Sequence, residues 1–175
     1  MLSNYQNQRP SQLKMRVCTY ICVVIRMKLE QAIQTQGFAS QKQKAGVNIM
    51  FTAYMVKTRV TQCLKPFDLT PEQFNVMRIL KGKYPEQMCV KDIASRVIER
   101  SSNIPRIIDR LVTKNWVQRA TSAVDKRETV MSITQEGMEV LQQASTALDQ
   151  AHLLSTGLSD EELTLLNELL DKYRG

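Results

Sequence analysis

Residues 89–137, CVKDIASRVIERSSNIPRIIDRLVTKNWVQRATSAVDKRETVMSITQEG, decide the fold of this chain. Apolar residues recur in the first part at helical spacing and in the last part with the partial alternation of strands. A proline near the middle prevents one helix from running through the whole first part. The stretch therefore predicts two short helices followed by a hairpin.

The second of these helices has two contrasting faces. Its apolar stripe at i, i+3, i+4, i+7 and i+8 consists of Ile104, Ile107, Ile108, Leu111 and Val112. Its polar face consists of Ser102, Arg106, Asp109 and Thr113, with Asn103 and Arg110 at the margins. Ser101 or Ser102 is expected to cap the first turn, where Pro105 needs no partner for its missing N–H. The helix should bury one side and present hydrogen-bond donors on the other.

The preceding helix is predicted over Val90–Glu99. Its own stripe consists of Val90, Ile93, Ala94, Val97 and Ile98. The link to the next helix is short and polar. Together these features predict a helix-turn-helix.

The hairpin is predicted from Val117–Thr121 and Thr129–Ile133, two short runs that contain β-branched residues. The connecting loop carries a charged tip at Asp125, Lys126 and Arg127. A charged tip is usually a solvated turn, but beside a helix shaped for a groove these cations could meet phosphate or a minor groove. The plan is a winged helix-turn-helix.

The same stretch resembles the multiple-antibiotic-resistance regulator (MarR) family of bacterial transcription factors. The resemblance rests on residues 90–119, on the wing motif Asp125-Lys126-Arg127 and on the exit ITQEG, and it extends more loosely from about Phe38 to the C-terminus. The family run Leu-x-x-x-Gly-Leu-x-x-Arg is matched by Leu111, Trp116 and Arg119. Asn115 replaces the usual glycine, a mild departure because Asn also tolerates a left-handed helix end.

The resemblance implies a homodimer of a mainly α protein with a small β-hairpin, in which N- and C-terminal helices interlock. The predicted domains are 27–66 for N-terminal dimerisation, 67–134 for the winged helix-turn-helix and 135–175 for C-terminal dimerisation. Before the winged motif, Thr70 with Pro71 and Gln73 predicts a capped helix start. The apolar breadth of residues 45–64 predicts a helix buried on more than one side, against its own domain and a second subunit. The helix after Thr134 should extend toward Leu154, and a leucine-rich helix should follow Ser159.

Each candidate site residue has an expected role. Arg106 can address guanine O6 and N7 bidentately from the major groove, whereas Ser102, Asn103 and Arg110 are expected to bind phosphate. Asp109 is expected to hold a neighbouring arginine. The resemblance points to Arg127 for minor-groove insertion with Asp125 orienting it, while Lys126 contributes mostly charge. For each cation the alternative is an ordinary solvated side chain.

Charge is distributed unevenly along the chain. The balance of Lys and Arg over Asp and Glu is +9 for residues 1–88, +4 for residues 89–134 and −6 for residues 135–175, which gives the total of +7. A basic winged segment is the expected footprint of a protein that neutralises phosphates. The acidic C-terminal segment should face away from DNA.

Other classes of function have little support. The chain has one histidine and no Gly-rich phosphate loop, nucleophile elbow or zinc spacing, so neither an enzyme nor a cofactor is expected. Four cysteines form no disulfide framework, which suits a reducing cytoplasm, and Cys63 and Cys89 are interpreted as buried inert thiols rather than oxidant sensors. No apolar run approaches the roughly 20 residues that span a bilayer.

Residues 1–26 are interpreted as an added or mis-started leader, with an edge strand or a helix covering the dimer as the alternative. The predicted function is a homodimeric regulator of transcription that binds double-stranded DNA at a pseudo-palindromic operator in the cytoplasm. The resemblance favours a repressor, because that is the habit of the family. The resemblance leaves open a small-molecule ligand that relieves binding. The competing hypothesis is a winged-helix module for protein association without specific DNA readout.

Overall fold

The computed structural model describes residues 27–99, 103–151 and 157–175. The described residues up to Ala53 form one compact unit, and those from Tyr54 onward form another. The interpretation of residues 1–26 as a leader lies outside the described residues. The domain boundaries expected from the sequence remain predictions.

The first unit contains the short helix α2 (Leu29–Ala32) and the beginning of helix α3 (Gln41–Leu64). Lys44 Nζ lies 2.5 Å from Glu30 Oε1, and Leu29 is buried. In the single chain Leu64 is the only buried residue of α3, so burial of a second side against a second subunit stays a prediction. Met50 and Tyr54 are about two-thirds exposed, at 66% and 67%. The apolar surface of this helix therefore exceeds what the chain itself covers.

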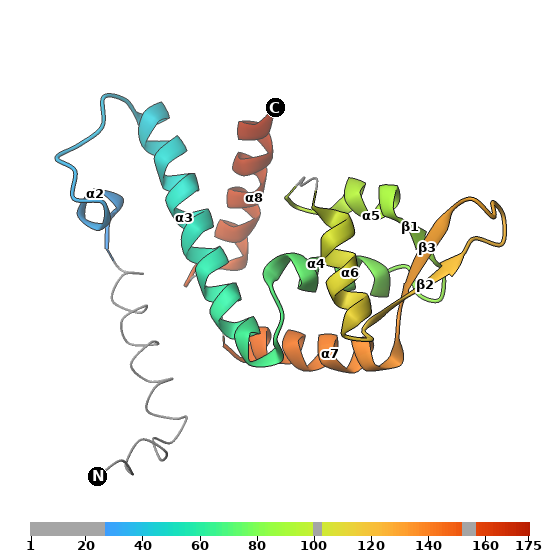
Figure 1. The fold of residues 1–175 in the computed structure, drawn as a ribbon. Helices are drawn as coiled ribbons and strands as arrows, with labels where there is room; N and C mark the ends of the chain where they lie inside the picture. Colours follow the sequence, from blue (N-terminus) through green and yellow to red (C-terminus); the bar gives the residue numbers. More distant parts are fainter. Residues whose placement is uncertain (1–26, 100–102, 152–156) are drawn as a thin grey trace, which may run out of the picture. The chain divides into compact units, whose positions relative to one another are not determined.

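The second unit holds the winged helix and the C-terminal helices (Figure 1). Its elements after α3 are η1 (Lys65–Phe67), α4 (Pro71–Lys81), β1 (Met88–Cys89), α5 (Val90–Arg96), α6 (Ile104–Thr113), β2 (Val117–Thr121), β3 (Thr129–Ile133), α7 (Gln135–Gln150) and α8 (Asp160–Arg174). The expected mainly helical fold with a small sheet is confirmed.

The core lies where α4, α6 and α7 meet the sheet. Its fully buried side chains include Met77, Leu80, Ile93, Ile108, Leu111, Met131 and Leu141. Three of them come from the stripes predicted for the two helices of the helix-turn-helix. Burial of such side chains is the main favourable term that holds α6 in place, at roughly 1.5–3 kcal/mol for each large aliphatic residue.

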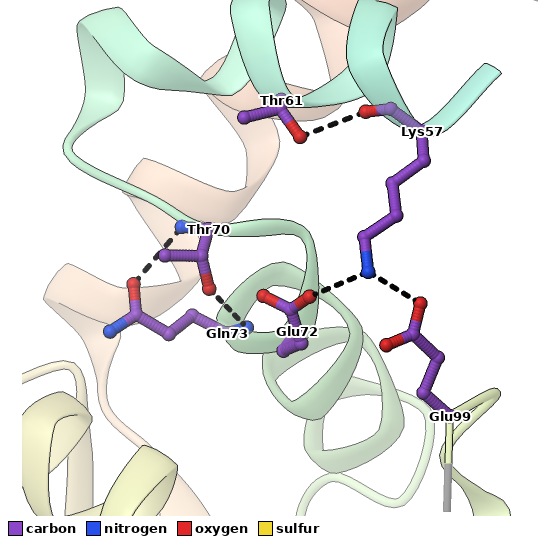
Figure 2. A network of polar contacts seen from close by, with 6 residues as sticks. All are labelled: Lys57, Thr61, Thr70, Glu72, Gln73 and Glu99. Carbon is purple, nitrogen blue, oxygen red and sulfur yellow. Dashed lines mark hydrogen bonds and ion pairs between the residues drawn. The ribbon is translucent and has the colours of Figure 1, made fainter. Parts of the chain in front are cut away.

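Helix α4 begins as its sequence predicts. Thr70 Oγ1 accepts a hydrogen bond from the Gln73 N–H at 3.3 Å, and Gln73 Oε1 accepts from the Thr70 N–H at 3.1 Å (Figure 2). This reciprocal capping box satisfies two backbone donors that no intrahelical carbonyl can reach. Pro71 occupies the first turn without loss.

The sheet has three antiparallel strands in the order β1-β3-β2. Strands β2 and β3 have the predicted bounds and pair from Val117 with Ile133 to Thr121 with Thr129. Strand β1 was not predicted, because two residues are too few to show alternation. It pairs Met88 with Met131 and so ties the start of α5 to the hairpin.

The first helix of the motif is shorter than predicted. Helix α5 ends at Arg96, and Val97 already has extended backbone with ψ 144°. Ile98 is therefore no part of a buried stripe, and it is 87% exposed. The prediction failed there because Ile98 follows the helical period in sequence but not in conformation.

The C-terminal helices start at their predicted caps. Thr134 Oγ1 accepts from the Gly137 N–H at 3.0 Å, and Ser159 with Glu162 forms a capping box on α8. Helix α7 ends at Gln150, and the predicted extension toward Leu154 falls on residues outside those described. Among the described residues, no helix is both long enough and apolar enough to cross a membrane.

Candidate nucleic-acid interface

Helix α6 presents the polar face that its sequence predicts. Arg106, Asp109 and Arg110 are exposed on the helix, while Ile104, Ile108 and Leu111 are buried beneath it. The residue before the helix is Asn103, also exposed, and its side chain makes no capping hydrogen bond. The expected cap at Ser101 or Ser102 falls outside the described residues, as does the site residue Ser102.

Asp109 is held by an arginine of the sheet. Arg119 Nη2 on β2 donates to Asp109 Oδ1, which joins the polar face of α6 to the first strand of the wing. The sequence suggested a neighbouring arginine without identifying it. The ion pair offsets the negative charge of Asp109 on this face of α6.

The loop between β2 and β3 is a wing that extends beyond the paired strands (Figure 1). Ser122 Oγ accepts from the N–H groups of Val124 and Asp125 at 3.2 and 3.3 Å. Asp125 Oδ1 accepts from the Arg127 N–H at 2.9 Å, and Arg127 Nε lies 3.6 Å from the same oxygen. The Arg127 side chain is nevertheless 94% exposed. Asp125 thus lies where it can orient Arg127, and Lys126 is exposed between them.

The C-terminal end of α6 borders an open groove of about 650 Å³. Its lining comes from the end of α3, from η1, from α4 and from α6, and includes Lys65, Asp68, Arg110 and Lys114. Lys114 Nζ lies 2.7 Å from Asp68 Oδ2 and 4.6 Å from the centre of the Trp116 ring. Arg110 therefore belongs both to the exposed face of α6 and to this groove.

The sequence did not reveal an ion-pair cluster that joins α3 to α4 and to Glu99, which follows α5. Lys57 Nζ on α3 lies 2.6 Å from Glu99 Oε1 and 3.3 Å from Glu72 Oε1 (Figure 2). The hydrogen bond with Glu99 raises the pKa of Lys57 above 10.5, against the opposing effect of burial. No local pattern marks such partners, because Lys57 and Glu99 are 42 residues apart.

The two cysteines in the described part of the chain are less buried than expected. Among the described residues neither Cys63 nor Cys89 forms a disulfide, and each is half-buried rather than fully buried. Within the described part of the chain, no three His, Cys, Asp or Glu side chains are grouped so that they could hold a metal ion. Cys18 and Cys22 lie outside that part.

Comparison with known proteins identifies a family whose sequence model matches this part of the chain. The model of the MarR family matches residues 69–129, from the approach to α4 into the wing. The chain is 30% identical over 106 residues to the uncharacterised HTH-type transcriptional regulator YpoP of Bacillus subtilis, a match covering 60% of this chain and 74% of YpoP. It is 27% identical over 117 residues to the multiple antibiotic resistance protein MarR of Escherichia coli, covering 65% and 78% of the two chains.

Solved structures have the same fold. A mutant MarR from Escherichia coli complexed with operator DNA superposes with a TM-score of 0.67 at 23% identity, over 84% of this chain and 99% of that one. The family model's match, residues 69–129, holds α4, the helix-turn-helix, β2 and the wing loop, and it ends at the first residue of β3. By its sequence relatives and its winged-helix fold, the chain belongs to the MarR family.

Proposed function

We propose that the protein is a sequence-specific regulator of transcription that binds double-stranded DNA as a homodimer. The observation that carries the proposal is the exposed polar face of α6, with Arg106 and Arg110, on a unit whose wing tip carries exposed Lys126 and Arg127. An exposed helix and a basic wing are the two parts with which winged helices contact a groove and its backbone. The relatives named above support it, since YpoP is a transcriptional regulator by name and the MarR structure contains operator DNA.

Each cation has a distinct expected contact. Arg106 lies near the N-terminal end of α6, the end that usually reaches base edges, and its guanidinium matches guanine O6 and N7. Ser102, Asn103 and Arg110 are assigned to phosphates, which fix register without reading sequence. Arg127 is assigned to the minor groove, and Lys126 to the general electrostatic attraction.

A homodimer is supported by apolar surface that the chain leaves uncovered. Leu165 and Leu169 of α8 are each 55% exposed, and Met50 and Tyr54 of α3 are exposed as well. A closed twofold dimer would cover such faces and present two copies of α6. The expected operator is a pseudo-palindrome with half-sites about one DNA turn apart.

Regulation is proposed at two levels. Repression of target genes in the cytoplasm, in association with the nucleoid, follows the habit of the family. The groove of about 650 Å³ could hold a small molecule, and three cations against one carboxylate in its lining favour an anionic one. Because Arg110 lies in this lining, such a ligand would compete with its phosphate contact.

The proposal is tested by selecting bound duplexes from a random DNA pool with purified protein at two salt concentrations. The expected result is a pseudo-palindromic consensus whose affinity falls steeply as salt rises, because phosphate contacts release counterions. No enrichment would contradict the proposal and favour a winged helix for protein association. A hydrophobic protein partner would also lack the steep salt dependence.

A further inference from the structure

The wing tip, residues 122–128, is closed by hydrogen bonds of its own backbone. The loop continues beyond the paired ends of β2 and β3 (Figure 1). The Ser122 N–H donates to the Glu128 carbonyl oxygen at 2.9 Å, and the Glu128 N–H donates to the Asp125 carbonyl oxygen at 2.9 Å. These two contacts give the wing tip a defined base.

The Ser122 side chain holds the first half of the wing tip. Its Oγ accepts hydrogen bonds from the Val124 N–H at 3.2 Å and from the Asp125 N–H at 3.3 Å. A serine hydroxyl that accepts from backbone groups two and three residues ahead stabilises a turn locally, without tertiary contacts. Ser122 itself is half-buried, whereas Val124 is 97% exposed. Ser122 is therefore placed to support the wing tip rather than to contact a ligand.

Asp125 connects this support to Arg127. The Asp125 N–H is bound by Ser122, and Asp125 Oδ1 accepts from the Arg127 N–H at 2.9 Å and lies 3.6 Å from Arg127 Nε. One carboxylate thus contacts both the backbone and the guanidinium of Arg127. The Arg127 side chain is nevertheless exposed, so it is available to an external partner. Ser122, Asp125 and Arg127 form a continuous series of contacts.

From this series of contacts we propose that Ser122 is a positioning residue for Arg127, which fixes the wing tip before DNA is bound. The inference rests on the proposed function, in which Arg127 enters the minor groove. A loop that is already ordered loses less conformational entropy on binding, so more of the contact energy appears as affinity. Without the Ser122 hydroxyl, the N–H groups of Val124 and Asp125 would bind water, and Asp125 would hold Arg127 in a looser loop.

The test measures the affinity of each variant for the duplex that the wild type selects. Ser122→Ala removes the acceptor of both hydrogen bonds, and the affinity should fall about three- to ten-fold, the effect of losing one or two net hydrogen bonds. Arg127→Ala should lower the affinity at least as much, because Ser122 acts through Arg127. In the Arg127→Ala background, Ser122→Ala should change the affinity by less than about two-fold, because changes within one network are not additive.

Two control variants separate the hydroxyl from other effects of substitution. Ser122→Thr keeps the hydroxyl and should retain the wild-type affinity. Ser145→Ala makes the same chemical change in α7, where Ser145 Oγ donates to the Leu141 carbonyl oxygen at 2.8 Å, and its affinity should equal that of the wild type. Urea unfolding shows whether each variant is folded. The midpoint of Ser122→Ala should stay near that of the wild type, because the wing tip lies outside the core.

Backbone order parameters from NMR relaxation describe the wing tip without DNA. In the free protein, the values for Val124, Asp125 and Arg127 should be lower in Ser122→Ala than in the wild type, and Ser122→Thr should restore them. If the wild type selects no duplex, the proposed function fails and this role fails with it. If the wild type does select one, three results would overturn the inference alone: an unchanged affinity of Ser122→Ala, an equal fall in the Arg127→Ala background, or unchanged order parameters.

Discussion

Gly137 is the residue whose identity the packing constrains most directly. A Cβ at this position would lie 2.2 Å from the Trp116 carbonyl oxygen and 3.0 Å from Ile133 Cγ1. The first of these is a backbone atom, which cannot move aside as a flexible side chain could. The first turn of α7 therefore approaches the wing strands as closely as it does only because residue 137 has no side chain.

Gly137→Ala is expected to lower the free energy of unfolding by about 1–3 kcal/mol, because the added methyl group would clash with the Trp116 backbone. Urea unfolding followed by circular dichroism measures the change. Gly82→Ala is the matched control, since a Cβ there meets its nearest neighbours at ordinary distances of 3.5 and 3.6 Å and the backbone φ is −66°. Equal losses in the two variants would contradict the steric explanation.

Single residues were predictable where backbone conformation sets the choice. Asn115 was expected to tolerate a left-handed helix end, and its φ is 57°. Its side chain also donates to Glu136 Oε2 at 3.2 Å, a contact that glycine could not make. The partners of Asp109 and Lys57 could not be named from the sequence, because tertiary ion pairs leave no periodic signal.

Among the elements, α4 depends most visibly on its first residues. The reciprocal hydrogen bonds of Thr70 and Gln73 satisfy donors that would otherwise face a half-buried helix end. The sequence predicted this start because the capping residues are adjacent to the helix they cap. The sequence did not predict β1, because this two-residue strand is defined by its pairing with β3. The predicted α5 was too long, because the apolar period continues past Arg96, where the helix ends.

Thr70→Ala is expected to lower the free energy of unfolding by about 1 kcal/mol, the usual effect of losing an N-cap. Thr61→Ala is the matched control, because the Thr61 hydroxyl only donates to the Lys57 carbonyl within α3 at 2.8 Å (Figure 2). Alanine there should be neutral or slightly stabilising, given its higher helix propensity. Thermal or urea unfolding distinguishes the two. A loss in Thr61→Ala as large as that in Thr70→Ala would contradict the capping argument.

The same end of α4 should make stability depend on acid pH. Burial acts to raise the pKa of Glu72, but hydrogen bonds from its backbone and Thr70 and the contact with Lys57 lower it below its ordinary value of 4.5. A carboxyl with a lowered pKa binds fewer protons when folded than when unfolded. Its contribution is therefore present above the unfolded pKa and is lost as the pH falls through the folded pKa.

The wild type should consequently be more stable than Glu72→Gln near neutral pH, and the difference should shrink as the pH falls from about 5 to about 3. Urea midpoints measured across this range provide the comparison. Between about pH 6 and 8 the difference should be constant. A difference that grew toward low pH would contradict the assigned sign.

For the whole molecule, the uncovered apolar surface is the feature that a single chain leaves unexplained. The sequence predicted a surplus of leucine at the C-terminus, and Leu158, Leu165, Leu166 and Leu169 are exposed. It also predicted a helix at 45–64 with broad apolar character, but not which part would remain uncovered. Exposure depends on which neighbours the rest of the chain supplies, which a local pattern cannot show.

The double change Leu165→Asp with Leu169→Asp should convert the proposed dimer to a monomer and abolish binding to the selected duplex. The two residues lie four apart on one face of α8, so their charges would disrupt a single apolar contact. Thr164→Asp with Asn167→Asp adds the same charge at exposed polar positions and should leave the dimer intact. Light scattering coupled to gel filtration gives the mass. A variant with both leucines replaced that remains dimeric would contradict the assignment of this face.

The central claim is that α6 reads base edges through Arg106, and one measurement addresses it directly. Duplex selection from a random pool is repeated with Arg106→Ala, with Lys126→Ala as the control for charge. The account predicts that Arg106→Ala loses the preference at one symmetric pair of guanines, worth about 1–3 kcal/mol each. Lys126→Ala should weaken all duplexes alike and keep the consensus. An unchanged consensus with Arg106→Ala would contradict the account.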